Sequence, residues 1–131
     1  MIMKKLALII ISLIVVMGTA CSQQGKNQVT DISADSLKAS MNQTDIVILD
    51  VRTPEEFADG HVEGAVNIDF KNADFSANID KLDKTKKYEV YCRSGHRSAE
   101  SAKVMNGKGF NVSNVTGGIL GWQEKGYPVV Q

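Results

Sequence analysis

The sequence predicts an α/β domain built on a mostly parallel sheet of five strands. Short β-favouring segments alternate with helical patterns from residue 29 onward. One segment, residues 46–49, is apolar without interruption, which is typical of a central strand buried on both faces. Strands that alternate with helices favour right-handed crossovers, and these crossovers make neighbouring strands parallel.

The first strand and helix are expected within residues 29–41. Residues 29–32 form a short strand candidate, and Ser33 is placed to cap a helix that continues to about Met41. Leu37 lies one turn before Met41, so both side chains should face the core.

The second pair consists of a central strand at residues 45–51 and a brief helix. Thr53 is expected to be the N-cap and Pro54 the first helical residue, while Glu56 completes a capping box. This helix should end around Gly60.

The next three elements are a strand, a weakly predicted helix and a second strand. Residues 65–68 form a strand candidate, and Ile79 and Leu82 mark a weak helix. Residues 88–91 alternate between β-favouring and polar side chains, which predicts the next strand.

The last three elements are a helix, a strand and a second helix. Residues 98–106 predict a helix in which Ala99 and Ala102 share a face that can lie close to a sheet, and glycines end it. Residues 112–116 form the last strand, followed by a glycine turn into a helix that holds Trp122.

The first 20 residues are predicted to be a lipoprotein signal peptide. Lys4 and Lys5 precede a short apolar stretch, and small residues stand immediately before Cys21. The stretch is shorter than the roughly 18 apolar residues of a membrane-spanning helix. Cys21 resembles the acylated cysteine of bacterial lipoproteins; the alternatives are an uncleaved anchor or an ordinary secretory signal.

A lipoprotein signal peptide implies both a division of the chain into segments and a location at the cell envelope. Residues 21–28 become a flexible tether and residues 29–131 the domain, held by lipid on the extracytoplasmic side of a bacterial envelope membrane. Removal of Lys4 and Lys5 leaves 13 basic against 15 acidic residues, so nothing suggests nucleic-acid binding or a polybasic membrane surface. An isolated domain of this size needs no partner to complete its core, and we expect a monomer.

The loop from Cys92 to Ser98 is the expected functional site. With Cys21 acylated, Cys92 has no partner for a disulfide, so it is either buried and inert or kept for reaction. It follows a strand, precedes a helix and lies beside Arg93 and Arg97. A helix N-terminus and nearby cations favour the thiolate, which argues for reaction.

Three segments in order resemble the signatures of a single rhodanese domain. Residues 49–68 resemble the pre-catalytic signature, residues 92–98 the active-site motif and residues 117–122 the C-terminal signature. The likeness runs from about residue 29 to residue 127. It implies a three-layer rhodanese-like fold and a sulfurtransferase activity that needs no metal or organic cofactor.

The resemblance implies that Cys92 is the catalytic nucleophile. Its thiolate would attack the outer sulfur of thiosulfate or a persulfide, and a thiol or cyanide acceptor would then take the sulfur from a Cys92 persulfide. The loop residues assigned to binding the small anionic donor are Arg93, Ser94, Gly95, His96, Arg97 and Ser98.

Individual roles follow from the chemistry of these side chains. Arg97 is expected to bind the sulfonate end of the donor and Arg93 to attract anions, although either could pair with a carboxylate. Ser98 could bind the sulfur or cap the following helix, and we expect the cap. Asp50 and Arg52 should brace the site from the neighbouring strand.

Two other functions are compatible with the same loop. One is a non-enzymatic sulfur carrier or redox module that passes persulfide to a protein partner. The other is a cysteine phosphatase or arsenate reductase, whose loop carries one residue more between the cysteine and the arginine. Here four residues separate Cys92 from Arg97, which favours sulfur chemistry.

Overall fold

The computed structural model describes residues 28–131, and strands and helices alternate along this part of the chain as predicted. The predicted signal peptide, the acylation site at Cys21 and all but the last residue of the tether lie outside the described residues. Between residues 28 and 131, no helix is long and apolar enough to cross a bilayer. The elements are β1 Thr30–Ile32, α1 Ala34–Ser40, β2 Ile46–Asp50, α2 Pro54–Asp59, β3 Val66–Asn67, α3 Phe75–Asp80, β4 Lys87–Tyr91, α4 His96–Gly107, β5 Asn111–Val115 and α5 Gly118–Glu124.

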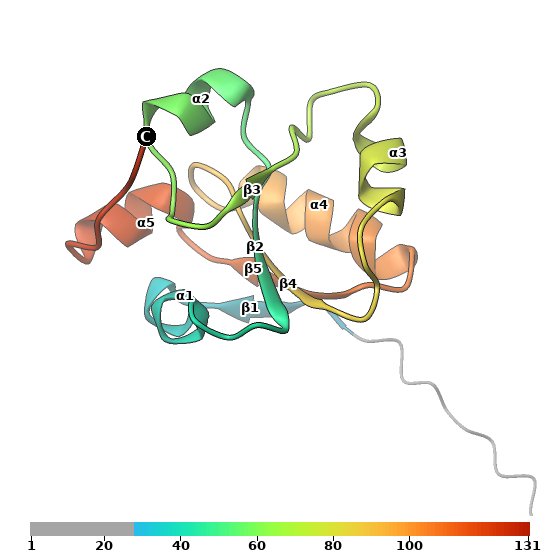
Figure 1. Ribbon diagram of the computed structural model, residues 1–131, viewed down its shortest axis with the longest axis horizontal. Coiled ribbons are helices and arrows are strands. Elements are labelled where there is room, and N and C mark those ends of the chain that lie inside the picture. Colours follow the sequence, from blue (N-terminus) through green and yellow to red (C-terminus); the bar gives the residue numbers. More distant parts are fainter. Residues whose placement is uncertain (1–27) are drawn as a thin grey trace, which may run out of the picture.

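The five strands form one sheet in the order β1-β5-β4-β2-β3, and every neighbouring pair of these strands is parallel. The prediction of a five-stranded, mostly parallel sheet is therefore confirmed. β4 lies at the centre between β2 and β5 (Figure 1). Its register pairs Tyr91 with Asp50 of β2. The residues that follow β2 and β4 therefore emerge side by side at the carboxyl edge of the sheet.

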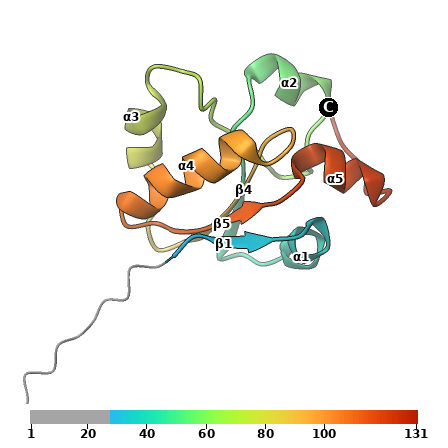
Figure 2. The ribbon, with the colours of Figure 1, turned by 180° about the vertical axis from the view of Figure 1, so that it is seen from behind.

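Helices cover both faces of the sheet, which makes three layers. Side chains from α3 and α4 pack with Val90 of β4 in one hydrophobic cluster, and side chains from α1 and α5 pack with Tyr91 in a second. Figure 2 shows α4 and α1 on opposite sides of the sheet. Successive residues of β4 point to opposite faces, which is why neighbours in sequence belong to different clusters.

The helix starts follow the predicted caps in two cases and differ in a third. The hydroxyl of Ser33 accepts the Ser36 N–H at 3.2 Å, and that of Thr53 accepts the Glu56 N–H at 3.3 Å. The predicted capping box is half formed, because the Glu56 carboxylate turns toward Arg97 instead of returning to Thr53.

α4 begins two residues earlier than predicted. Its N-cap is Gly95 rather than Ser98, with φ at 108°, in the left-handed region that favours glycine.

The start of α5 is pressed against the loop that follows β4. The Ile119 N–H donates to the Cys92 carbonyl at 2.9 Å, and the Leu120 N–H donates to the Arg93 carbonyl at 3.2 Å. This approach requires Gly118, because a Cβ at this position would lie 2.4 Å from the Cys92 carbonyl oxygen. The φ of Gly118 is +56°, which adds backbone strain to any substitution.

Gly118→Ala should destabilise the protein more than a glycine change at a similar φ in open space. Gly126 is the matched control, since its φ is +77° and a Cβ added there would have no neighbouring atom within 4 Å. We expect Gly126→Ala to lower the free energy of unfolding by about 1 kcal/mol, and Gly118→Ala to cost a further 1–3 kcal/mol or so from the clash. Urea unfolding followed by Trp122 fluorescence measures both, and equal losses would contradict the proposed contact.

Candidate active site

Cys92 is the residue directly after β4, at the carboxyl edge of the central strand. It is 1% exposed, and its side chain packs in the same cluster as Val90 and Ala102. It is a free cysteine. Burial among apolar neighbours would by itself produce an inert thiol, so the polar contacts of the sulfur decide its chemistry.

The loop turns hydrogen-bond donors onto the Cys92 sulfur. The Gly95 N–H lies 3.1 Å from Sγ, and the Ser98 hydroxyl lies 3.4 Å from it. Gly95 reaches this position because its φ of 108° bends the chain into the first turn of α4. The sulfur therefore lies beside the N-terminus of a helix and accepts hydrogen bonds from that end.

These donors lower the pKa of the Cys92 thiol below its ordinary value. Burial is the largest single influence and raises the pKa, but hydrogen bonds from the Ser98 hydroxyl and from the N–H groups of Ser98, Gly95 and Ser94 together outweigh it. The stabilisation expected from the helix N-terminus agrees with these contacts, whereas the guanidinium groups are not among the larger causes. The largest lowering contributions come instead from neutral donors of the loop.

Arg97 and Arg93 occupy different environments. The Arg97 Nη2 atom lies 3.0 Å from Glu56 Oε2 and 3.2 Å from Oε1, so this guanidinium is paired with a carboxylate of α2. Arg93 is exposed. Of the two roles considered for these arginines, pairing with a carboxylate describes Arg97 in this structure.

Of the other loop residues, Ser98 contacts the Cys92 sulfur through its side chain, whereas Ser94 and His96 are exposed. Ser98 is fully buried with its hydroxyl on the sulfur, so it binds the sulfur and does not cap the helix. Ser94 and His96 are exposed, and Ser94 contributes through its backbone N–H. The imidazole of His96 therefore faces outward at the first residue of α4.

Asp50 and Arg52 form a buried ion pair beside the loop. The Arg52 Nη2 atom lies 2.6 Å from Asp50 Oδ2, and Nε lies 3.0 Å from both carboxylate oxygens. The same Nη2 donates to the Gly60 carbonyl at 2.7 Å, which ties the end of α2 to the end of β2. Asn67 donates to the carbonyls of Asp50 and Arg52, so the strand end is held from a third side.

Tyr91 completes this support from within the sheet. Its ring lies 5.6 Å from the Arg52 guanidinium carbon, and its hydroxyl accepts the Val62 N–H at 3.1 Å. Burial and then the nearby Asp50 carboxylate raise the pKa of Tyr91 far above its ordinary value, so it stays neutral. The roles of Tyr91 and Asn67 could not be predicted from the sequence, because both are ordinary strand residues there.

His61 and Trp122 support the fold. The His61 ring stacks on Phe57 with centroids 3.6 Å apart and contacts the Phe57 carbonyl through Nδ1 at 2.9 Å. Trp122 is 1% exposed, and its indole N–H donates to the Pro128 carbonyl at 2.8 Å. Within residues 28–131, no three His, Cys, Asp or Glu side chains lie close enough to share a metal ion.

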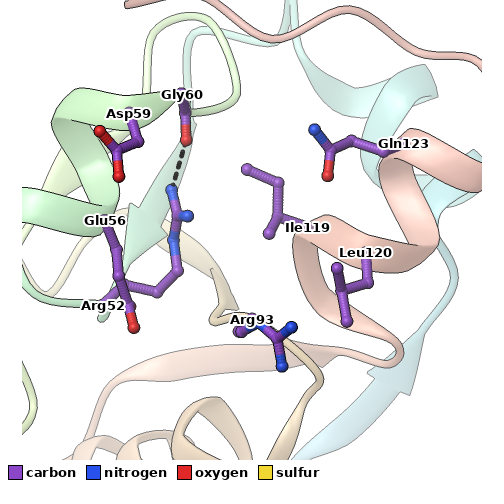
Figure 3. Close-up of a pocket in the computed structure, with 8 residues that line it drawn as sticks. All are labelled: Arg52, Glu56, Asp59, Gly60, Arg93, Ile119, Leu120 and Gln123. Atoms are coloured by element: carbon purple, nitrogen blue, oxygen red, sulfur yellow. Dashed lines mark hydrogen bonds between the residues drawn. The ribbon is translucent and has the colours of Figure 1, made fainter.

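A cavity of about 260 Å³ opens between α2 and α5, next to the loop (Figure 3). Carboxylates of α2 and apolar side chains of α5 line it, together with two arginines. The lining residues are Arg52, Glu56, Asp59, Gly60, Arg93, Ile119, Leu120 and Gln123. A small organic molecule in this cavity would lie beside the backbone of the loop that holds Cys92.

The geometry as a whole suits nucleophilic chemistry at sulfur. A thiolate held by N–H donors can attack an electrophilic sulfur, and the same donors can hold the negative charge of the resulting persulfide.

Comparison with known proteins agrees with this arrangement. Residues 33–125 match the family described as the rhodanese-like domain. YtwF of Bacillus subtilis, provisionally named a sulfurtransferase, is 34% identical over 102 residues, which are 77% of this chain and 97% of that protein. A sulfurtransferase of Allochromatium vinosum is 31% identical over 104 residues, 78% of this chain and 95% of that one.

A solved structure gives the same result. The crystal structure of a rhodanese-related protein from Thermoplasma volcanium is similar with a TM-score of 0.71 and 35% sequence identity, over 77% of this chain and 97% of that chain. The family match includes the ends of β2 and β4 and the whole loop around Cys92. The resemblance noted in the sequence is thereby confirmed, and the chain belongs to the rhodanese-like family, whose members include sulfurtransferases.

Proposed function

We propose that this protein is a sulfurtransferase that moves a sulfane sulfur from thiosulfate or a persulfide to a thiol or cyanide acceptor. The observation that carries the proposal is the set of hydrogen bonds that converge on the Cys92 sulfur and lower its pKa. A buried cysteine without such donors would be unreactive at neutral pH.

The reaction is a double displacement at Cys92. The thiolate attacks the outer sulfur of thiosulfate, the sulfur–sulfur bond of the donor breaks, and sulfite leaves with the electron pair. The product is a Cys92 persulfide whose negative charge the loop N–H groups can hold. The acceptor then attacks the outer sulfur and regenerates the Cys92 thiolate, so cyanide becomes thiocyanate.

The surroundings of the loop support an anionic donor and an organic acceptor. Arg93 is exposed beside Cys92 and can attract an anion. The cavity between α2 and α5 combines Ile119 and Leu120 with charged side chains, and its size suits a small thiol.

Cys92→Ser should abolish sulfur transfer. The unaltered protein incubated with thiosulfate should gain the mass of one sulfur atom and form thiocyanate when cyanide is added, because Cys92 holds the transferred sulfur. The variant should do neither while unfolding at a similar urea concentration, since serine is nearly isosteric. Retention of transfer in the folded variant would place the reaction elsewhere.

Two further measurements separate the alternative functions. Slow turnover with small thiols, together with rapid single transfer to one protein partner, would favour a sulfur carrier. Release of phosphate from an aryl phosphate would favour a phosphatase.

Ser98→Ala should raise the pKa of the Cys92 thiol. The Ser98 hydroxyl lowers this pKa, so its removal moves thiolate formation to higher pH and slows persulfide formation at neutral pH by roughly tenfold, as expected for loss of a hydrogen bond to a charged group. The absorbance of the thiolate against pH, measured as a difference from Cys92→Ser, gives the titration.

Ser101→Ala is the matched control for that titration. Ser101 is a buried serine of the same helix, but its hydroxyl donates to the Arg97 carbonyl at 2.7 Å. If the two variants titrate alike, the hydroxyl of Ser98 has no special effect on the sulfur.

We also propose that the protein is a lipoprotein anchored through Cys21, on the strength of the leader sequence alone. Cys21→Ser should move the protein from the membrane to the soluble fraction of the producing bacterium, because each buried methylene of an acyl chain contributes about 0.8 kcal/mol to membrane binding. Ser22→Ala is the control and should stay with the membrane. If Cys21→Ser also stays there after its leader has been removed, the anchor is not a lipid on this cysteine.

A further inference from the structure

We infer that Glu56 is a specificity-determining residue that reduces the affinity of the site for dianionic sulfur donors. It does so by occupying the Arg97 guanidinium, which would otherwise be free to bind the second negative charge of the donor. The inference rests on the proposed function and deepens it, because it concerns which class of donor the site accepts.

The contact joins two elements that are far apart in the sequence. Glu56 lies in α2 and Arg97 in the first turn of α4, 41 positions later. The Arg97 Nη2 atom lies within 3.2 Å of both carboxylate oxygens of Glu56. The side chains are 17% and 34% exposed for Arg97 and Glu56, so the pair is only partly screened by water.

α2 is held so that Glu56 keeps this position. The Thr53 hydroxyl caps the first turn through the Glu56 N–H, and Arg52 donates to the Gly60 carbonyl at the other end of the helix. The carboxylate is therefore presented to α4 by a helix fixed at both ends, and its pairing with Arg97 follows from the fold.

The pair leaves binding capacity unused. The Arg97 Nη1 atom and the Glu56 Oε2 atom are both buried, and neither has a hydrogen-bond partner among the described residues. Oε2 is close to Nη2 but does not have the geometry of a hydrogen bond. A guanidinium with a buried free N–H can donate hydrogen bonds to an oxyanion when its present carboxylate partner is removed.

Two of the three arginines at the site are paired with carboxylates. Arg52 is paired with Asp50, and Arg97 is paired with Glu56. Arg93 lines the same cavity as Asp59. Arg93 is exposed, and no carboxylate pairs with it among the described residues, so Glu56 is the carboxylate whose loss would free a second loop arginine.

The test compares two donors that differ in charge and deliver sulfur in the same way. Thiosulfate is a dianion and releases sulfite, whereas methanethiosulfonate is a monoanion and releases methanesulfinate. Each gives its outer sulfur to the Cys92 thiolate. Steady-state kinetics with cyanide as acceptor are measured for the unaltered protein, Glu56→Gln and the control Glu55→Gln, which removes an exposed carboxylate from the same helix turn.

Glu56→Gln should raise kcat/KM for thiosulfate by about tenfold through a lower KM, because one guanidinium becomes available to the extra charge. The value for methanethiosulfonate should change by less than about threefold, and the selective gain should shrink as salt is added. Glu55→Gln should leave both values unchanged. Glu56→Ala, which also removes the carboxylate, should reproduce the selective gain.

Two results would overturn the inference. One is an equal change for the two donors in Glu56→Gln and Glu56→Ala, and the other is a gain of the same size in Glu55→Gln. Absence of transfer from both donors in the unaltered protein would instead reject the proposed function itself. The two failures are therefore distinguishable in one set of measurements.

Discussion

The structure depends on a balance of two opposing effects at the Cys92 sulfur. Burial at the end of the central strand disfavours a charged sulfur, while the hydroxyl of Ser98 and the N–H groups of the loop favour it. The donors prevail because they are already oriented by the turn at Gly95 and by the first turn of α4. A site built in this way keeps water away from a reactive sulfur without neutralising it.

The remainder of the carboxyl edge holds that loop in place. β4 is flanked by β2 and β5, so its end cannot move without disturbing two strand pairs. α5 donates two backbone hydrogen bonds to the carbonyls of Cys92 and Arg93, and it comes close enough only because residue 118 is glycine. On the other side, the buried pair of Asp50 and Arg52 links the end of β2 to α2. Such a pair is costly to break, because one partner alone would be left as a buried charge.

Charge at this site is arranged in local pairs. The three arginines of the chain lie at the strand ends and in the loop, and two of them are joined to carboxylates of the same domain. The Cys92 thiolate is stabilised mainly by hydrogen-bond donors of the loop, while the paired guanidinium groups of Arg52 and Arg97 join neighbouring elements to α2. Stabilisation of the sulfur and positioning of the surrounding elements are thus carried by different groups, which can be varied separately.

The sequence by itself determined the local elements, while the tertiary structure decided which of them meet. The apolar run at residues 46–49, the caps at Ser33 and Thr53 and the reactive loop after residue 91 could all be predicted, because each depends on residues close together in the chain. The ends of elements depend also on the turns beside them, and α4 begins at His96 because the turn at Gly95 leads straight into it. The sequence left open whether Ser98 contacts the sulfur or caps the helix, and the structure shows the contact. The pairing of Glu56 with Arg97 and the need for glycine at 118 could not be predicted. They join segments that the crossovers of the sheet bring together, and no local pattern records the distance or direction of those contacts.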